Sequence, residues 1–236
     1  MIAEIKNRIF AEYPYKTELH AHTLPISPCS EFYPEALIEA YLKTGVSSIV
    51  LTNHFTHAKI KDGGRAYVDE FIRAYFDFKA CADEKGIKAI FGIELRFAEN
   101  ANDYLVLGVE PEDAYEISKY AALGLEAFRR EYKKEGMLVI QAHPKRDGMT
   151  DMPLDLLDGI ESFNMHPGHN SRPAISARIA NQNGKIATGG TDFHHHGHEG
   201  CCLLRSKKML TSSAELSKLL ISRDYVLDIS GSIILP

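Results

Sequence analysis

The stretch YKTELHAHT, from Tyr15 to Thr23, decides how the rest of the chain is interpreted. Its first half is typical of a short buried strand, and a His-x-His pair closes it. Side chains two residues apart in an extended strand point to the same side. His20 and His22 are therefore expected to face one side of the strand end, where a single metal ion can bind both.

The remainder of the chain repeats this alternation of a short apolar strand and a helix. Pro34 stands at the start of one helix and Gly45 just past its end, the positions that these residues prefer. The strands are rich in Val, Ile and Leu with little alternation, which is typical of parallel strands buried on both faces. Further strands are expected at 15–19, 46–51, 87–93, 104–109, 137–141, 159–163, 185–188 and 225–229, and helices at 34–44, 67–85, 112–135, 172–182 and 214–222.

About seven such alternations favour an α/β fold, either a closed barrel or a large doubly wound sheet. No linker, repeat or shift of composition divides the chain, so residues 1–236 are expected to form a single domain.

Polar residues with metal-binding side chains follow several of these strands. His54, Glu94 and His143 close three of them, and Asp192 and His194 follow a fourth. The C-terminal strand ends of a barrel meet at one mouth. Imidazole and carboxylate groups are the usual ligands of Zn, Mn and Fe, and the two oxygens of one carboxylate such as Glu94 can bridge two metals. The pattern predicts a metal site at this mouth.

Composition limits the class of protein. The net charge is −5 and no basic run is present, which argues against binding to a long nucleic acid. No segment approaches the roughly 20 apolar residues of a membrane span, and the first residues have no signal-peptide pattern. The four cysteines form no Cys-x-x-Cys pair, so a reduced, cytoplasmic protein without membrane attachment is expected.

Five segments resemble, in order, the motifs of the PHP (polymerase and histidinol phosphatase) family: ELHAHT (18–23), TNH (52–54), GIE (92–94), AHP (142–144) and GTDFH (190–194). The resemblance extends from about residue 16 to residue 230. It implies a distorted seven-stranded, TIM-like (β/α) barrel with the active site at the C-terminal strand ends. It also implies a phosphoesterase with two to three divalent metal ions (Zn, Mn or Fe). The expected substrate is a small phosphorylated molecule, either a phosphomonoester such as a histidinol-phosphate-like compound or a small phosphodiester, attacked by metal-activated hydroxide.

The resemblance also implies a ligand set. One metal would be held by His20, His22, Glu94 and Asp192, a second would share Glu94 and take His143, and a third would take His54 and His194. As a hypothesis, His194 or His143 protonates the leaving oxygen when it is not fully engaged as a ligand.

Two positions depart from the family pattern. Members usually carry an acidic residue or a His several residues after His-x-His, where this chain has only Cys29 as a ligand type. Many also carry a His on the strand after the bridging Glu, and Tyr104 is expected to replace it here. Candidate replacement ligands are Asp103, Cys29, His57, His166 and His196.

Cations near the expected mouth are candidates for binding phosphate, namely Arg65, Arg96, Lys145 and Arg172. Glu161 and Asn164 end another strand, and Glu161 is a candidate for orienting a ligand.

Three other functions fit parts of the pattern. An amidohydrolase-like C–N hydrolase also uses His-x-His and a late Asp, but commonly has a bridging Lys at the fourth strand. A non-catalytic metal-binding module would keep the ligands without turnover. A nuclease acting on a dinucleotide or a 3′-phosphate also remains open.

Overall fold

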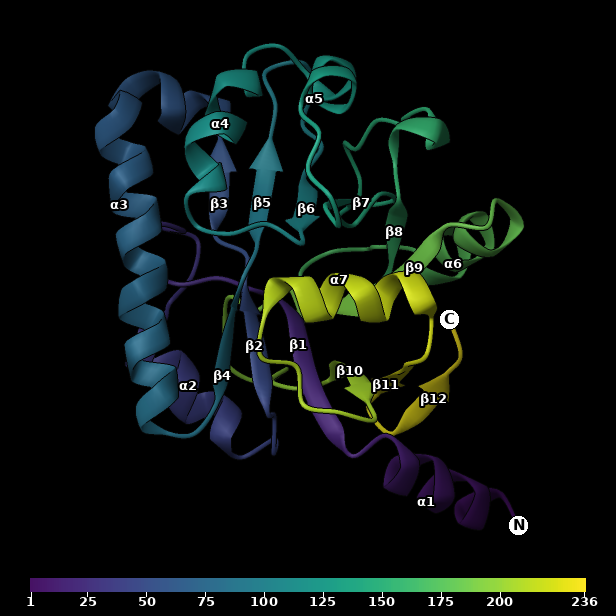
Figure 1. The fold of residues 1–236 in the computed structure, drawn as a ribbon. Helices are drawn as coiled ribbons and strands as arrows, with labels where there is room; N and C mark the ends of the chain where they lie inside the picture. Colours follow the sequence, from purple (N-terminus) through teal and green to yellow (C-terminus); the bar gives the residue numbers. More distant parts are fainter.

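The computed structural model describes residues 1–236, and its strands form two six-stranded sheets (Figure 1). The first has the order β12-β11-β10-β1-β2-β4 and the second the order β3-β5-β6-β7-β8-β9. The strands of the first sheet are β1 (Tyr15–Ala21), β2 (Ser48–Leu51), β4 (Lys88–Phe91), β10 (Cys202–Ser206), β11 (Val226–Ile229) and β12 (Ser232–Ile234). Those of the second are β3 (His54–Thr56), β5 (Ile93–Arg96), β6 (Tyr104–Leu107), β7 (Leu138–Gln141), β8 (Gly159–Asn164) and β9 (Ile186–Gly190).

The two sheets are joined without closing into a barrel. β2 leads directly into β3, and β4 into β5, so these two chain segments pass from the first sheet to the second. On the other side β9 approaches β1, but only an isolated bridge between Ala21 and Phe193 connects them. The expected α/β class is observed. The expected closed seven-stranded barrel is not, because the hydrogen-bonded ladder is interrupted at these two places.

Strand directions also differ from the all-parallel expectation. β1, β2 and β4 are parallel, as are β7, β8 and β9, but β6 is antiparallel to both of its neighbours. β10, β11 and β12 are antiparallel too. Because β6 is reversed, its N-terminal end lies beside the C-terminal ends of β5 and β7, with Tyr104 paired to Leu95 and Gln141. Asp103, which precedes β6, therefore lies at the edge where the expected ligands gather.

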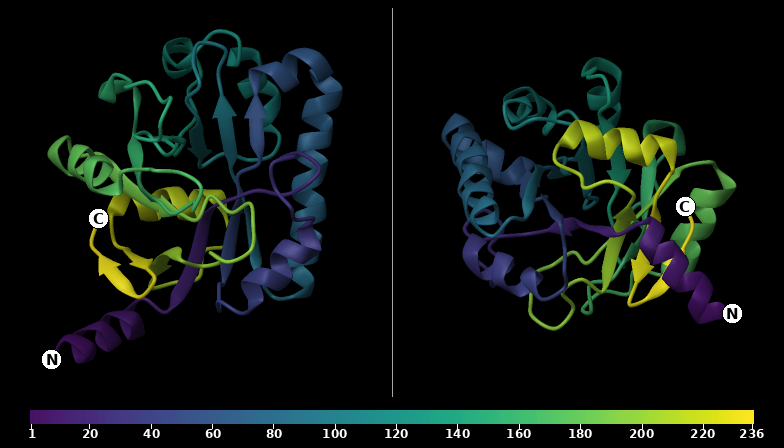
Figure 2. Two further views of the ribbon diagram at one scale, coloured as in Figure 1. Left: turned by 180° about the vertical axis from the view of Figure 1, so that it is seen from behind. Right: turned by 60° about the horizontal axis from the view of Figure 1, so that its bottom comes forward.

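The helices are α1 (Ile2–Glu12), α2 (Pro34–Leu42), α3 (His57–Glu84), α4 (Asp113–Tyr120), α5 (Leu125–Glu131), α6 (Pro173–Gln182) and α7 (Ser213–Ser222), with a 3₁₀ turn η1 (Leu154–Leu156). α3 begins earlier than expected, at His57, and is broken at Gly64, where φ is 56°. The single helix expected at 112–135 is two helices, α4 and α5, because Gly124 turns the chain at φ 90°. α1 was not predicted. It has no buried residue and projects from the rest of the molecule in each view (Figures 1 and 2).

Two apolar clusters support the sheets. The larger contains 35 buried residues, among them Phe55, Phe71 and Phe91, beneath α2 and α3. The smaller contains 15 and includes Leu105, Ile140 and Leu216, the last on α7. Together they hold the strands from which the candidate ligands project. No helix combines the length and apolarity needed to cross a membrane.

Candidate metal centre

The four residues expected to hold one metal lie together and are buried. Nε2 of His20 is 3.2 Å from Oε1 of Glu94 and 3.4 Å from Oδ1 of Asp192. Nε2 of His22 is 3.3 Å from the same Asp192 oxygen and 3.6 Å from Oε2 of Glu94. His20 and His22 come from β1, Glu94 from β5, and Asp192 from the loop after β9. Four side chains from three parts of the chain thus direct nitrogen and oxygen atoms at one point.

A second group of side chains that could bind a metal shares Glu94; a donor atom here is one that can donate an electron pair to a metal. Nε2 of His143 is 3.1 Å from Oε1 of Glu94 and 3.7 Å from Oδ2 of Asp103. All three side chains are buried, and one donor atom of each lies within 4.8 Å of the others. Asp103 therefore stands where the family's additional His was expected. Tyr104 does not, since its hydroxyl accepts a hydrogen bond from Asn102 and its ring packs against Phe97.

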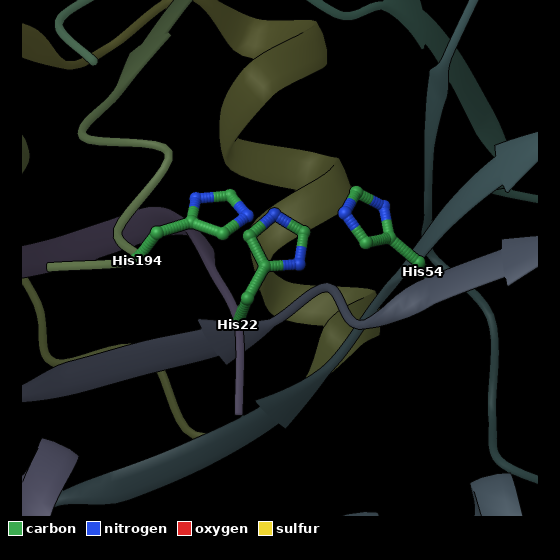
Figure 3. Close-up of side chains that lie close together, drawn as sticks. All are labelled: His22, His54 and His194. Atoms are coloured by element: carbon green, nitrogen blue, oxygen red, sulfur yellow. The ribbon is translucent and has the colours of Figure 1, made fainter. Parts of the chain in front are cut away.

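A third group consists of His22, His54 and His194, whose ring nitrogens face one another (Figure 3). The three rings form a triangle, with the His22 centroid 4.5 Å from that of His54 and 4.4 Å from that of His194, and the latter two 5.9 Å apart. Nδ1 of His54 also lies 2.5 Å from Oε2 of Glu94. Glu94 thus touches all three groups.

Several buried donor atoms at this point have no hydrogen-bond partner. They include Nε2 of His20, Nε2 of His22 and Oε2 of Glu94. His54 Nδ1 is also unpartnered as a hydrogen-bond donor, since its short contact with Glu94 is poorly directed. Buried polar atoms are normally satisfied, because leaving one unpaired costs about 1–3 kcal/mol. Nitrogen and oxygen atoms that converge without partners fit divalent metal ions.

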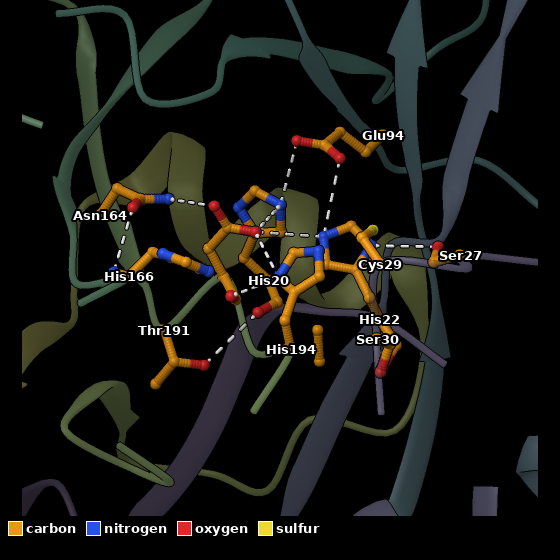
Figure 4. A network of polar contacts seen from close by, with 12 residues as sticks. His20, His22, Ser27, Cys29, Ser30, Glu94, Asn164, His166, Thr191 and His194 are labelled. Atoms are coloured by element: carbon orange, nitrogen blue, oxygen red, sulfur yellow. Dashed lines mark hydrogen bonds and ion pairs between the residues drawn. The ribbon is translucent and has the colours of Figure 1, made fainter. Parts of the chain in front are cut away.

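Other buried groups hold the ligands in orientation (Figure 4). Nδ1 of His20 donates to Oε1 of Glu161 at 2.8 Å, which turns Nε2 toward Glu94 and Asp192. Asn164 donates to Oδ2 of Asp192 at 3.1 Å. Carboxylate and amide partners of this kind fix the ring orientation and tautomer of ligand histidines. Glu161 therefore has the orienting position that the sequence suggested.

Glu18 holds the same strand next to the site. It accepts hydrogen bonds from the backbone of His20 and Thr191 and from the hydroxyls of Tyr41 and Thr191. Burial raises the pKa of Glu18 to about 7 despite these bonds. Both of its oxygens are occupied by these bonds and it belongs to none of the donor groups, so we regard it as structural.

Charge compensation within the site favours the ionised forms of Glu94 and Asp192, whereas burial and the charge of Glu94 raise the pKa of Asp103. Burial raises the pKa of Glu94, but His54 and His20 outweigh burial and hold that pKa well below the usual range. The pKa of Asp192 is also held low against burial, chiefly by His20 and His22. Ionised carboxylates are the form that binds metal.

Two of these residues have strained backbones. His143 has φ 30° and Asp192 has φ 51°, in the left-handed region that residues other than Gly rarely adopt. Such conformations cost on the order of 1–3 kcal/mol and concentrate at functional sites. Both side chains lie among the metal-type ligands described above.

A cavity of about 300 Å³ opens onto the donors. Arg96, one of the predicted phosphate-binding candidates, lines it, and so does Arg146, which the sequence interpretation missed. Both guanidinium groups contact Asp103, Arg96 through two hydrogen bonds and Arg146 at 3.6 Å. Cys29 and His166 also line the cavity, together with His169, another residue that was missed.

The remaining candidates lie elsewhere. Arg65 is 76 % exposed, pairs with Asp69 and stacks on Tyr115. Lys145 pairs with Asp151, and Arg172 with Asp147. His196 pairs with Glu199, and His57 is the first residue of α3 and belongs to none of the donor groups. These five were predicted from proximity along the chain, and none of them lines the cavity beside the donors.

Comparison with known proteins gives the following results. A family model described as the PHP domain matches residues 18–232. No curated protein matches the chain. One similar solved structure is a two-domain protein from Bacteroides vulgatus that contains a predicted PHP-like metal-dependent phosphoesterase. It is 17 % identical with a TM-score of 0.63, over 91 % of this chain and 64 % of that one.

Two further structures are similar over most of both chains. PsfC from Pseudomonas syringae is 15 % identical with a TM-score of 0.62, over 85 % of this chain and 86 % of its own. A candidate metal-dependent phosphoesterase from Bifidobacterium adolescentis is 14 % identical with a TM-score of 0.52, and the match covers 87 % of this chain and 95 % of that one. At these identities the structural matches concern the fold alone.

Proposed function

The chain belongs to the PHP domain family, and from this premise we propose that it is a metal-dependent phosphoesterase that hydrolyses a small phosphorylated substrate. The observation that carries the proposal is the convergence of three overlapping donor groups on Glu94 and His22, with buried ring nitrogens that lack hydrogen-bond partners. Two to three divalent ions, Zn, Mn or Fe, would be held there. His20, His22, Glu94 and Asp192 would hold one, Glu94, His143 and Asp103 a second, and His54 and His194 a third.

Bound divalent ions supply a Lewis acid for the phosphoryl oxygens and lower the pKa of water toward 7. The protein's own contribution begins with orientation. Glu161 holds His20, and Asn164 holds Asp192, so the donors are placed before substrate arrives. Placement of this kind reduces the reorganisation needed during reaction.

Arg96 and Arg146 supply the positive charge for the phosphate group. Asp103 accepts from Nε and Nη2 of Arg96, which leaves Nη1 free to donate to a phosphate oxygen. Guanidinium groups match phosphate geometry well and stay charged at all relevant pH values. With both lining a cavity of about 300 Å³, the arrangement supports a small phosphomonoester better than a polymer.

The proton for the leaving oxygen is assigned to His143 or His194, which both line the cavity. Nδ1 of His194 faces the carbonyl oxygen of Asp192 at 2.8 Å, and Nε2 of His143 faces Glu94. In His194 this leaves Nε2 to face a substrate or a metal. In His143 it is Nε2 itself that lies beside Glu94 and Asp103, while Nδ1 is buried without a partner. Each ring can therefore act as the acid only while its Nε2 binds no metal.

The alternative of a C–N hydrolase lacks the bridging lysine that would support it. Lys145 is the lysine nearest in sequence to the donors, two residues after His143, and its ammonium group pairs with Asp151. The phosphoesterase is therefore the stronger proposal.

The test combines elemental analysis of the purified protein with turnover of a generic phosphomonoester and a phosphodiester. We expect more than one metal per chain and hydrolysis that chelation abolishes and Mn or Zn restores. Glu94→Gln should remove both metal and turnover, because Glu94 touches every donor group. Glu199→Gln, which alters a carboxylate paired with His196, should leave both unchanged.

A chain that binds less than one metal under saturating Zn and Mn, and hydrolyses neither ester, would overturn the proposal. Metal binding without turnover of either ester would favour the non-catalytic module instead.

A further inference from the structure

Cys29 lies against the third donor group. Its Sγ is 3.2 Å from Nε2 of His54, its thiol also contacts His194, and all three residues line the same cavity (Figure 4). No side chain with ligand chemistry other than Cys29 is present in residues 25–30, where PHP-family members usually carry an acidic residue or a His.

The loop that carries Cys29 is held in place on both sides. Ser27 Oγ accepts from the backbone NH of His54 at 3.0 Å and lies 3.3 Å from Nδ1 of His22. Ser30 Oγ donates to the carbonyl oxygen of His22 at 2.9 Å. Both serines are buried, so the thiol is fixed by its neighbours rather than carried on a free loop.

An independent observation points to a ligand at the same place. Ring nitrogens of His22, His54 and His194 lie within 4.8 Å of one another beside Cys29, and Nε2 of the fully buried His22 has no hydrogen-bond partner (Figure 3). A buried imidazole nitrogen without a partner is costly unless something binds it. Three imidazoles that converge beside a thiol form a point that a cation can fill, with Nε2 of His22 directed at the neighbouring pair Glu94 and Asp192.

We infer that Cys29 is a metal ligand and that, with His54 and His194, it forms a thiolate-containing site for a thiophilic divalent ion such as Zn(II) or Co(II). The inference rests on the proposed metal dependence and deepens it.

The geometry is close to what such a site requires. With metal–sulfur and metal–nitrogen bonds of about 2.3 and 2.0–2.1 Å in a tetrahedron, sulfur and nitrogen are about 3.6 Å apart. The Cys29–His54 distance of 3.2 Å needs only a few tenths of an ångström of adjustment. Three protein ligands leave one of four positions open, as in catalytic zinc sites.

The thiolate gives this site a preference for Zn over Mn that the other two metal sites lack. Thiolate ligands select Zn over Mn, whereas mixed His and carboxylate sites accept both. We therefore expect Zn to enter the Cys29 site first when Zn is limiting and Mn is in excess.

The experiment is titration of metal-free protein with Co(II), followed by absorption spectroscopy. Wild-type protein should show a near-ultraviolet thiolate-to-cobalt charge-transfer band in addition to visible bands. Cys29→Ser should lose the charge-transfer band and weaken one site for Zn by about tenfold or more. Cys29→Asp restores the acidic residue usual in the family, and should keep the bound ion without the band.

Cys81→Ser is the matched control, because Cys81 is a partly buried free thiol on α3 that does not line this cavity. Its spectrum should equal that of wild type. Zn-loaded wild type should also show a zinc–sulfur distance of about 2.3 Å by X-ray absorption, absent from Cys29→Ser.

Cobalt bound without a charge-transfer band, or a band that survives in Cys29→Ser, would overturn the cysteine ligand while leaving the metal centre intact. Failure of wild-type protein to bind cobalt at all would overturn the proposed function as well.

Discussion

Replacing Glu161 by Gln is expected to weaken metal binding while leaving the protein folded. Glu161 is 1 % exposed and accepts three hydrogen bonds. Oε1 accepts from Nδ1 of His20, and Oε2 accepts from the backbone NH of His143 at 2.8 Å and from Asn164 at 3.0 Å. A glutamine cannot satisfy all three donors, because one end of its side chain is itself a donor.

Either orientation of the new amide disturbs the site. With its oxygen toward His20, its NH₂ group meets the donors of His143 and Asn164, leaving buried donors unpaired at about 1–3 kcal/mol each. With its NH₂ toward His20, Nδ1 must become an acceptor. The proton then moves to Nε2, the atom that should bind metal.

Loss of an outer partner of this kind typically costs 10–100-fold in metal affinity or activity, which corresponds to about 1.4–2.8 kcal/mol. The assay is metal affinity by competition with a chelator, with thermal denaturation measured on the same samples. Asp228→Asn serves as control, since it alters another buried carboxylate, paired with Arg205 away from the donors. Unchanged affinity in Glu161→Gln, or an equal loss in Asp228→Asn, would refute the orienting role.

Three further predictions follow from other parts of the structure. Arg146→Met should lower kcat/KM for a phosphomonoester by about 10–150-fold, since hydrogen bonds to charged groups contribute about 1.5–3 kcal/mol; steady-state kinetics checks this, and exposed Arg65→Met should behave as wild type. Asp113→Asn should lower the free energy of unfolding by roughly 1 kcal/mol at pH 7, allowing for solvent screening. Burial raises the pKa of Asp113, but hydrogen bonds from Lys134, the Glu110 backbone and Tyr132 outweigh it and lower that pKa. The contribution is therefore present at neutral pH and lost as the pH falls below about 4, where urea denaturation of the two proteins should converge. Gly190→Ala should destabilise the protein by about 1–3 kcal/mol and reduce its metal content, because a Cβ there would lie 2.6 Å from Cβ of His20. Elemental analysis measures the metal content and thermal denaturation the stability. A variant with unchanged stability and metal content would show that β9 can move away from β1.

The positions of the metal-type ligands along the chain were predictable because local patterns determine them. A short apolar strand that leads into His or Glu places that side chain at the end of the strand or just beyond it, whatever the strand pairs with; Glu94 lies just beyond β4, as the second residue of β5. His20, His22, Glu94 and His143 were found in this way, and all four lie in the donor groups.

The predictions that were wrong or missing concern features that depend on contacts between segments distant in the sequence. Reversal of β6 cannot be recognised from its own residues, yet it decides that Asp103 rather than Tyr104 faces the donors. Arg146 was missed for a similar reason, since it lies three residues after His143 and reaches the cavity only because the chain turns at that residue. Arg65 and Lys145 show the opposite error, since closeness in sequence to a ligand does not direct a long side chain toward it.

The same few residues concentrate features that lower the stability of the fold. His143 and Asp192 hold left-handed backbones, each at a cost on the order of 1–3 kcal/mol. Around them, ionised Glu94 and Asp192 are buried beside ring nitrogens without partners. Packing offers no reason for strain, buried charge and unpaired donors to coincide, because apolar residues would remove the buried charge and the unpaired donors, and Gly would relieve the backbone strain. Metal ions that bind the native state but not the unfolded chain stabilise the native state by mass action, which offsets such costs. Metal binding, rather than the requirements of folding, therefore accounts for this cluster of residues.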